Sequence, residues 1–188
     1  MRIRQQILQS LALGVLCASA TAQAADIPQP LRTWLLAIEA VPNAEQVRRA
    51  GGAKTEALLD AVVLDAKEPS YARHRALSLL SLLDTPAALQ TLRKHLTIKD
   101  DALRATAAVA WASGPARRHP QTAWKDLDRL LADRAPQVRA AAARALALTG
   151  DVKGARERAL ARRAHETVPE VQKALDRAVQ QLGERERQ

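Results

Sequence analysis

Aromatic residues are scarce in this chain of 188 residues. Phe is absent, and three Trp and one Tyr make up an aromatic content of 2%. A large aromatic core is therefore excluded, although aromatic side chains dominate the buried area of many proteins. Ala and Leu must fill the interior instead, so we expect helices that pack closely. With 47% apolar and 26% charged residues, the composition is otherwise that of an ordinary globular chain.

Cysteine is nearly absent as well, since Cys17 is the single one. It belongs to an N-terminal segment with the anatomy of a secretory signal peptide: Arg2 and Arg4, then a short apolar run, then small residues at Ala22 and Ala24. We expect residues 1–24 to be removed, leaving residues 25–188 in the periplasm without a cysteine. An uncleaved membrane anchor is the alternative interpretation.

Motifs that carry chemistry are missing too. The sequence has no Gly-rich phosphate loop, no HExxH motif and no GxSxG motif. Its four histidines lie in different segments without the spacing of metal ligands, so each is expected at the surface or at a helix end. We therefore expect no catalysis, no metal and no cofactor.

Positive charge is what the chain has in excess. The net charge is +9, and it is +7 without Arg2 and Arg4. Most of the basic residues are Arg, whose planar guanidinium pairs well with carboxylate or phosphate. Acidic proteins, anionic lipid headgroups and envelope polymers are all compatible partners.

One amphipathic segment, residues 133–150, organises the rest of the sequence. Pro136 is tolerated in a first helical turn, and Gly150 is a natural end. Between them, apolar residues recur at helical spacing and share one face: Val138, Ala141, Ala142, Ala145 and Leu146. The pattern predicts an amphipathic helix.

The same pattern recurs along the chain. Arg73, Arg104 and Arg139 mark equivalent positions 31 and 35 residues apart, and Gln172 follows after a further 33. Repeats of this length are typical of stacked helical hairpins. We predict an all-α, right-handed α-solenoid of about four to five hairpins.

This solenoid forms one domain after the signal peptide. We expect an atypical N-terminal cap at 27–52, with a first helix that includes Ile38 and ends at Pro42. Four units follow at 55–84, 86–114, 121–150 and 151–183, with second helices at 70–83 and 101–113 in the first two. Residues 183–188 are expected to be a frayed tail.

The repeat resembles the HEAT repeat, in particular the short HEAT-like form of phycobilin lyases. The residues that carry the resemblance are Asp133, Pro136, Val138, Arg139, Ala142 and Leu146. The resemblance implies that the second helices line a concave surface. It also implies a structural ladder in which Arg73, Arg104 and Arg139 pair with acidic turn residues such as Asp101 and Asp133.

A partner-binding groove is expected on the outward face of the second helices. Its candidate residues are small and apolar in the middle and basic toward the C-terminus: Leu77, Ala108, Val109, Ala112, Ala143, Arg144, Ala147, Lys173 and Arg177. Such a surface suits a helix or peptide better than a sugar-phosphate backbone. The alternative is that the alanines only let neighbouring helices approach closely.

A second candidate surface is the segment from Ser113 to Gln121, which holds Arg117, Arg118 and His119. Insertions between repeats often serve binding, so these three residues are a candidate basic loop. A solvated connector is the simpler interpretation.

The preferred functional hypothesis is a non-catalytic exported scaffold or adaptor, a monomer that binds a protein or peptide of the cell envelope. A nucleic-acid-binding repeat protein is an alternative favoured by the charge but opposed by the export signal. A chromophore-lyase-like role is suggested by the repeat subtype alone. Peripheral contact with anionic lipid or polymer is a further possibility.

Overall fold

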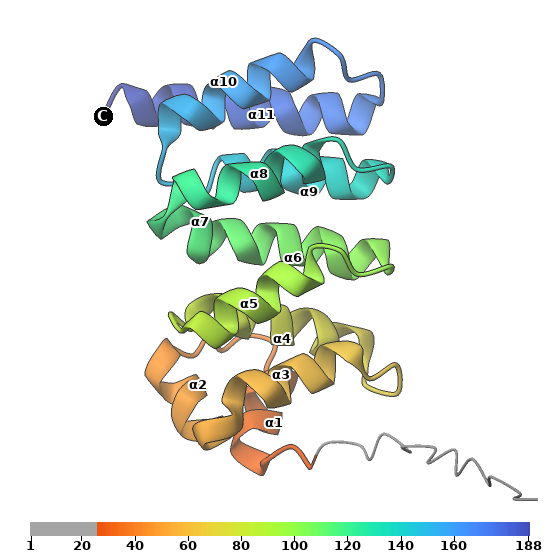
Figure 1. Cartoon of the computed structure of the whole chain (residues 1–188), viewed down its shortest axis with the longest axis vertical. Coiled ribbons are helices and arrows are strands. Elements are labelled where there is room, and N and C mark those ends of the chain that lie inside the picture. The colour runs from red at the N-terminus through yellow and green to blue at the C-terminus, as the bar shows by residue number, and fades with distance from the viewer. Residues whose placement is uncertain (1–25) are drawn as a thin grey trace, which may run out of the picture.

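The computed structural model describes residues 26–188 and shows an all-helical protein (Figure 1). No strand occurs in this part of the chain. The signal peptide expected at residues 1–24 lies outside it. The helices are α1 (Gln29–Leu36), α2 (Ala44–Gly51), α3 (Thr55–Leu64), α4 (Ser70–Leu82), α5 (Pro86–His95), α6 (Asp101–Ser113), α7 (Pro115–Arg118), α8 (Pro120–Leu131), α9 (Pro136–Leu146), α10 (Val152–Arg163) and α11 (Pro169–Glu186), with a 3-10 turn at Gly52–Lys54.

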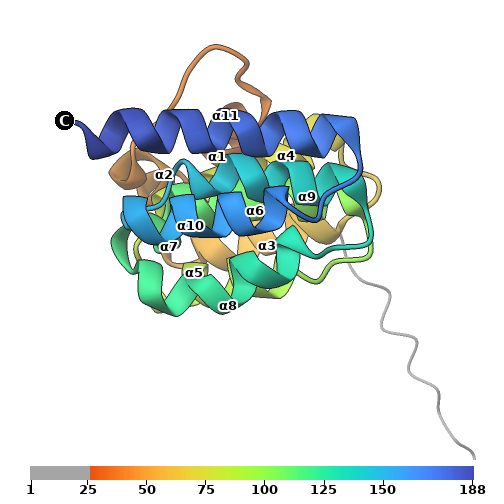
Figure 2. The same ribbon diagram turned by 90° about the horizontal axis from the view of Figure 1, so that it is seen from above.

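Helices that follow one another in the sequence pack as pairs. The pairs are α3 with α4, α5 with α6, α8 with α9 and α10 with α11, and they succeed one another along the long axis of the molecule (Figure 1). The second helices also contact each other, from α4 to α6, from α6 to α9 and from α9 to α11. Seen from above, α4, α9 and α11 lie on one side and α3, α5 and α8 on the other (Figure 2).

Local sequence signals explain where the helices begin. Proline at a helix start loses no intrahelical hydrogen bond, because the first N–H groups have no partner there. Asp and Thr before a helix accept hydrogen bonds from those same N–H groups. The first device is used by Pro86, Pro120, Pro136 and Pro169, and the second by Thr85, Asp100 and Asp151.

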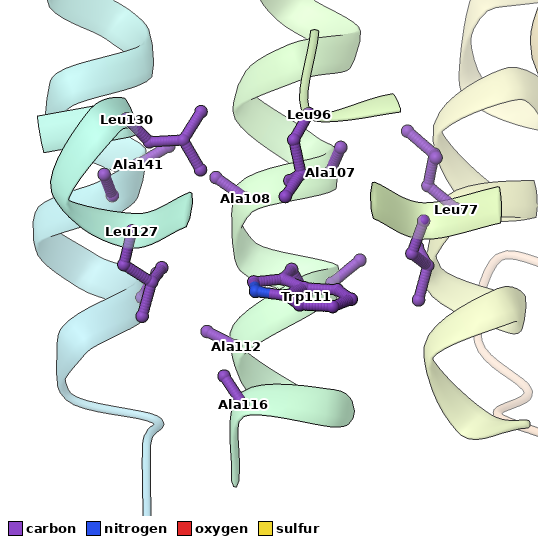
Figure 3. Packing of buried hydrophobic residues seen from close by; sticks show 14 of the residues in the cluster. Leu77, Leu96, Ala107, Ala108, Trp111, Ala112, Ala116, Leu127, Leu130 and Ala141 are labelled. Carbon is purple, nitrogen blue, oxygen red and sulfur yellow. The ribbon is translucent and has the colours of Figure 1, made fainter. Parts of the chain in front are cut away.

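The core is built from leucine and alanine, as the shortage of aromatic residues predicts. Figure 3 shows Ala108 and Ala112 pointing from α6 toward the side where Leu127 and Leu130 of α8 lie. Trp111 and Trp124 are exceptions, two buried indoles among these smaller side chains. Alanine faces let neighbouring helices approach closely, which brings many atoms into contact range.

The helices predicted at 70–83 and 101–113 are confirmed almost to the residue by α4 and α6. The first helix is shorter than predicted. It ends at Leu36, and Ile38 is 92% exposed rather than part of its apolar face. At the other end, residues 183–186 continue α11 instead of forming a frayed tail. Leu182 is fully buried there, which ties the last turns to the core.

Gly150 does not end the organising helix, contrary to the prediction. α9 stops at Leu146, and its last carbonyl groups are met by the N–H groups of Leu148 and Thr149. A Cβ atom on Gly150 would lie 2.3 Å from the carbonyl oxygen of Arg117. Glycine is therefore needed because the loop after α9 packs against the backbone of α7, where a side chain has no room.

No helix among residues 26–188 is long and apolar enough to cross a membrane. The longest of them, α11, carries charged residues along its length.

Candidate binding groove

Arginine side chains of the second helices reach the turn that precedes the next second helix. Arg73 Nη1 lies 3.9 Å from Asp100 Oδ2, and Arg73 Nε donates to the carbonyl of Val63. Arg104 Nε lies 2.8 Å from Asp133 Oδ2, and its Nη2 donates to Asp101. Each arginine thus joins two successive helix pairs.

The third link uses Glu166 where the earlier ones use aspartate. Arg139 Nε lies 2.9 Å from Glu166 Oε2, and Arg162 donates to the same carboxylate at 2.7 Å. The hydrogen bond from Arg139, helped by those from Arg162 and the N–H of Val168, overcomes burial and lowers the Glu166 pKa to about 2.

Asp133 is ionised for a similar reason. Burial raises its pKa, but the hydrogen bond from Arg104, the N–H of Ala135 and the charges of Arg104 and Arg134 together bring the pKa below its usual value. These arginine side chains face the interior of the stack and are engaged by the chain's own carboxylates and carbonyls. They serve to join helices and are not available to a ligand.

Four residues expected to line an open groove are instead fully buried: Leu77, Ala108, Ala112 and Ala143. The expectation that these positions meet a partner is therefore wrong. Of their helices, α6 packs against both α4 and α9, and the four side chains belong to the hydrophobic core. The alternative interpretation, in which alanine lets the helices approach closely, describes the middle of the molecule.

An open groove does exist nearer the C-terminal end of the molecule. It has a volume of about 610 Å³ and is lined by residues of α6, of α9 and the turn after it, and of α11. Four of the residues predicted from sequence contribute to it, namely Val109, Arg144, Ala147 and Arg177. Its other lining residues are Leu148, Ala174, Ala178, Gln181, Glu184, Arg185 and Gln188. Lys173 is exposed on α11 but is not among the lining residues.

The groove has an apolar floor and a polar rim. Ala174 and Ala178 are nearly buried beneath it, whereas Leu148 is 38% exposed and presents a large apolar side chain to solvent. Arg144 and Arg177 are exposed at its edge. An apolar surface with a few polar groups at its margin is the usual composition of a site that binds peptides or other proteins.

Arg185 lines the groove and already makes hydrogen bonds within the chain. Its guanidinium donates to the carbonyl of Ala147 at 2.6 Å and to that of Thr149 at 3.1 Å, so it binds the carbonyls that follow the C-terminus of α9. Within residues 26–188, by contrast, no hydrogen bond or ion pair engages the side chains of Arg144 or Arg177.

The candidate basic loop is one helical turn rather than a loop. α7 buries Pro115 and Ala116 against its neighbours, while Arg117 and Arg118 are exposed. Arg118 pairs with Asp84 at 3.0 Å, and the carbonyl of Arg117 packs against Gly150. His119 is exposed in the turn that leads into α8. This segment does not contribute to the groove of α6, α9 and α11.

One histidine lies at a helix end, as predicted, but is buried there: His95 is the last residue of α5. His95 is 1% exposed, and its Nε2 lies 2.6 Å from Asp60 Oδ1. Burial lowers its pKa in spite of the hydrogen bond and charge of Asp60. Among residues 26–188, no group of three or more His, Cys, Asp or Glu side chains is placed to hold a metal ion.

Seven lining residues were not predicted from the sequence: Ala174, Ala178, Gln188, Leu148, Gln181, Glu184 and Arg185. The last two belong to the segment expected to be frayed, and Leu148 to the final turn expected to be helical. The spacing of Leu175, Ala178 and Leu182 was the available signal that the helix continues. Neither a protein-family model nor a curated protein matches the chain.

Proposed function

We propose that this protein is a non-catalytic exported scaffold, a HEAT-like α-solenoid that binds a protein or peptide of the cell envelope through the groove of α6, α9 and α11. The observation that carries the proposal is the groove itself. It combines an exposed apolar side chain, Leu148, with two unpaired arginines. A convex helix or strand fits such a concavity better than a flat surface does.

The repeat interpretation rests on the regular links between pairs. Arg73, Arg104 and Arg139 occupy equivalent positions, and each reaches the acidic residue before the next second helix. A stack joined in this way is an extended support for the groove near its C-terminal end. Repeat architectures commonly use concave faces to bind other proteins.

Export is the part of the proposal that depends on the N-terminal sequence. Cell fractionation followed by intact mass of the recovered protein tests it. We expect periplasmic protein whose sequence begins near Ala25. We expect this protein to be a monomer. Cytoplasmic protein that still carries residues 1–24 would contradict export and would make nucleic-acid binding the next hypothesis to examine.

The groove is tested by a matched pair of leucine variants. Leu148→Asp places a charge on the apolar floor, whereas Leu160→Asp makes the same change on α10, where Leu160 is 46% exposed and outside the groove. We expect the first variant to lose a partner captured from a periplasmic extract and the second to retain it, with equal helicity in both. Equal capture by the two variants would rule out the groove.

A further inference from the structure

Several arginines near the C-terminal end of the molecule have an acidic partner within the chain. Arg139 and Arg162 share Glu166, while Arg158 pairs with Asp128 and Arg163 with Asp176. Against this background, Arg144 and Arg177 stand out because both face the groove and neither has a partner among the described residues.

These two arginines occupy equivalent positions in successive helix pairs. They are 33 residues apart, the same interval that separates Pro136 from Pro169 at the starts of α9 and α11. The two helices are in contact. Packed helices have axes about 8–10 Å apart, so the two guanidinium groups start from neighbouring points on one edge of the groove. Flexible side chains can close the remaining distance to a ligand with two negative groups.

The groove places apolar surface beside this pair of charges. Leu148 is exposed next to Ala147, and Val109 lies at the equivalent position one pair earlier than Arg144, 35 residues before it. A ligand that uses both features must carry carboxylates and an aliphatic side chain on one surface. An amphipathic helix does so, because residues three or four apart lie about 6 Å from each other on the same face.

We infer that the occupant of this groove is an acidic amphipathic helix of the partner protein. Two of its carboxylates, one helical turn apart, pair with Arg144 and Arg177, and an adjacent aliphatic side chain packs on Leu148. This inference rests on the proposed function and adds the chemistry of the partner to it. Bidentate guanidinium–carboxylate pairs give such contacts both affinity and register.

The groove is less suited to a continuous polyanion. Glu184 lies on its lining and would face the phosphates of a nucleic acid or a lipid surface. Two arginines are also few compared with the contacts that phosphate backbones require. A helix with discrete carboxylates can avoid Glu184, whereas an unbroken row of phosphates cannot.

A peptide-display selection tests the inference without knowledge of the natural partner. The probe is a library of 16-residue amphipathic helices whose polar and apolar positions are randomised, selected against the full-length mature protein. We expect enrichment of Asp or Glu pairs spaced three or four residues apart next to Leu, Ile or Val. Synthetic peptides from the selection should bind about tenfold more weakly when both acids become Gln.

Charge-matched variants then locate the binding site. The double variant Arg144→Gln, Arg177→Gln should weaken these peptides by about tenfold. The control is Arg48→Gln in a protein that keeps Arg144 and Arg177. Arg48 is an exposed arginine of α2 at the opposite end of the molecule, so this variant should leave the peptide affinity unchanged. Vesicles containing anionic lipid provide the competing ligand.

The outcomes separate this inference from the proposed function. Selected peptides without acidic enrichment that still lose binding on Leu148→Asp would overturn the acidic helix but leave the groove as a peptide site. Binding of anionic vesicles that depends on both arginines, with no peptide enriched, would overturn both. Acidic peptides whose affinity survives the double arginine variant would also overturn the inference.

Discussion

Glu166 shows how a charged side chain is kept ionised inside the stack. It is buried, but two arginines and two main-chain N–H groups surround its carboxylate. Its pKa of about 2 lies below the value of 4.5 for a free side chain, so folding favours the ionised form. The resulting stability is fully present above pH 4.5 and is lost as the pH falls toward 2.

Because the Glu166 pKa is lowered by folding, we predict that the stability difference between the wild type and Glu166→Gln depends on pH. The shift corresponds to about 3 kcal/mol, since one pKa unit is worth about 1.4 kcal/mol. The free energies of unfolding, measured with urea, should differ by about that amount at pH 7 and converge between pH 4.5 and 2. A difference that does not change with pH would mean that the Glu166 pKa is normal in the folded protein.

Gly150 permits a second prediction for a single residue. In Gly150→Ala the new Cβ would lie 2.3 Å from the Arg117 carbonyl oxygen, and the backbone of α7 would have to move. We expect a loss of about 1–3 kcal/mol in the free energy of unfolding, the usual cost of overpacking.

Gly183→Ala is the matched control for that change. Gly183 lies inside α11, and its added Cβ would be no closer than 3.7 Å to Arg156, an ordinary contact. Alanine favours helix over glycine, so this variant should gain about 0.5–1 kcal/mol. Destabilisation of similar size in both variants would show that the close approach to α7 is not the cause.

At the scale of helices, the small side chains of buried alanines allow α6 and α9 to pack closely. Ala143 is fully buried in α9, so an arginine there has no room and no partner for its charge. Ala143→Arg should therefore lower the free energy of unfolding by more than about 3 kcal/mol. Ala161→Arg on the exposed side of α10 should change it by less than about 0.5 kcal/mol. Far-ultraviolet circular dichroism during urea titration measures both, and equal stability of the two variants would contradict this packing.

Helical periodicity predicted the elements well where it was strong. The starts of α6, α9 and α11 follow from Asp100, Pro136 and Pro169, whose effects act within one turn. Helical periodicity did not predict the helix ends that are determined by tertiary contacts. Gly150 looked like a helix end because sequence does not show that the carbonyl of Arg117 lies against it.

The candidate groove was predicted only in part for the same reason. On a single helix, Ala108, Ala143 and Arg144 all lie outside the main apolar stripe, and the sequence does not reveal which of them faces a neighbouring second helix. The contacts of α6, α9 and α11 bury the two alanines and leave the arginine exposed. Sequence identified the charge at the C-terminal end, and three-dimensional packing determined the shape of the site.

At the scale of the whole molecule, the helix pairs follow one another along the long axis, and the groove lies near the C-terminal end. Buried arginine links join the pairs, and the last second helix, α11, extends beyond α9, where Arg185 binds the carbonyls after it. The groove therefore belongs to helices that are fixed to each other. A rigid site of this kind costs little conformational entropy when a partner binds.

The central claim is that this groove contacts a partner in the cell envelope. Its most direct test is photo-crosslinking in intact cells, with a photoreactive amino acid introduced at Leu148 or, as the control, at Leu160. We predict a discrete crosslinked species from Leu148 in the periplasmic fraction, lost when Arg144 and Arg177 are changed to Gln, and none from Leu160. Identical crosslinking patterns from the two positions, or none from Leu148, would contradict it.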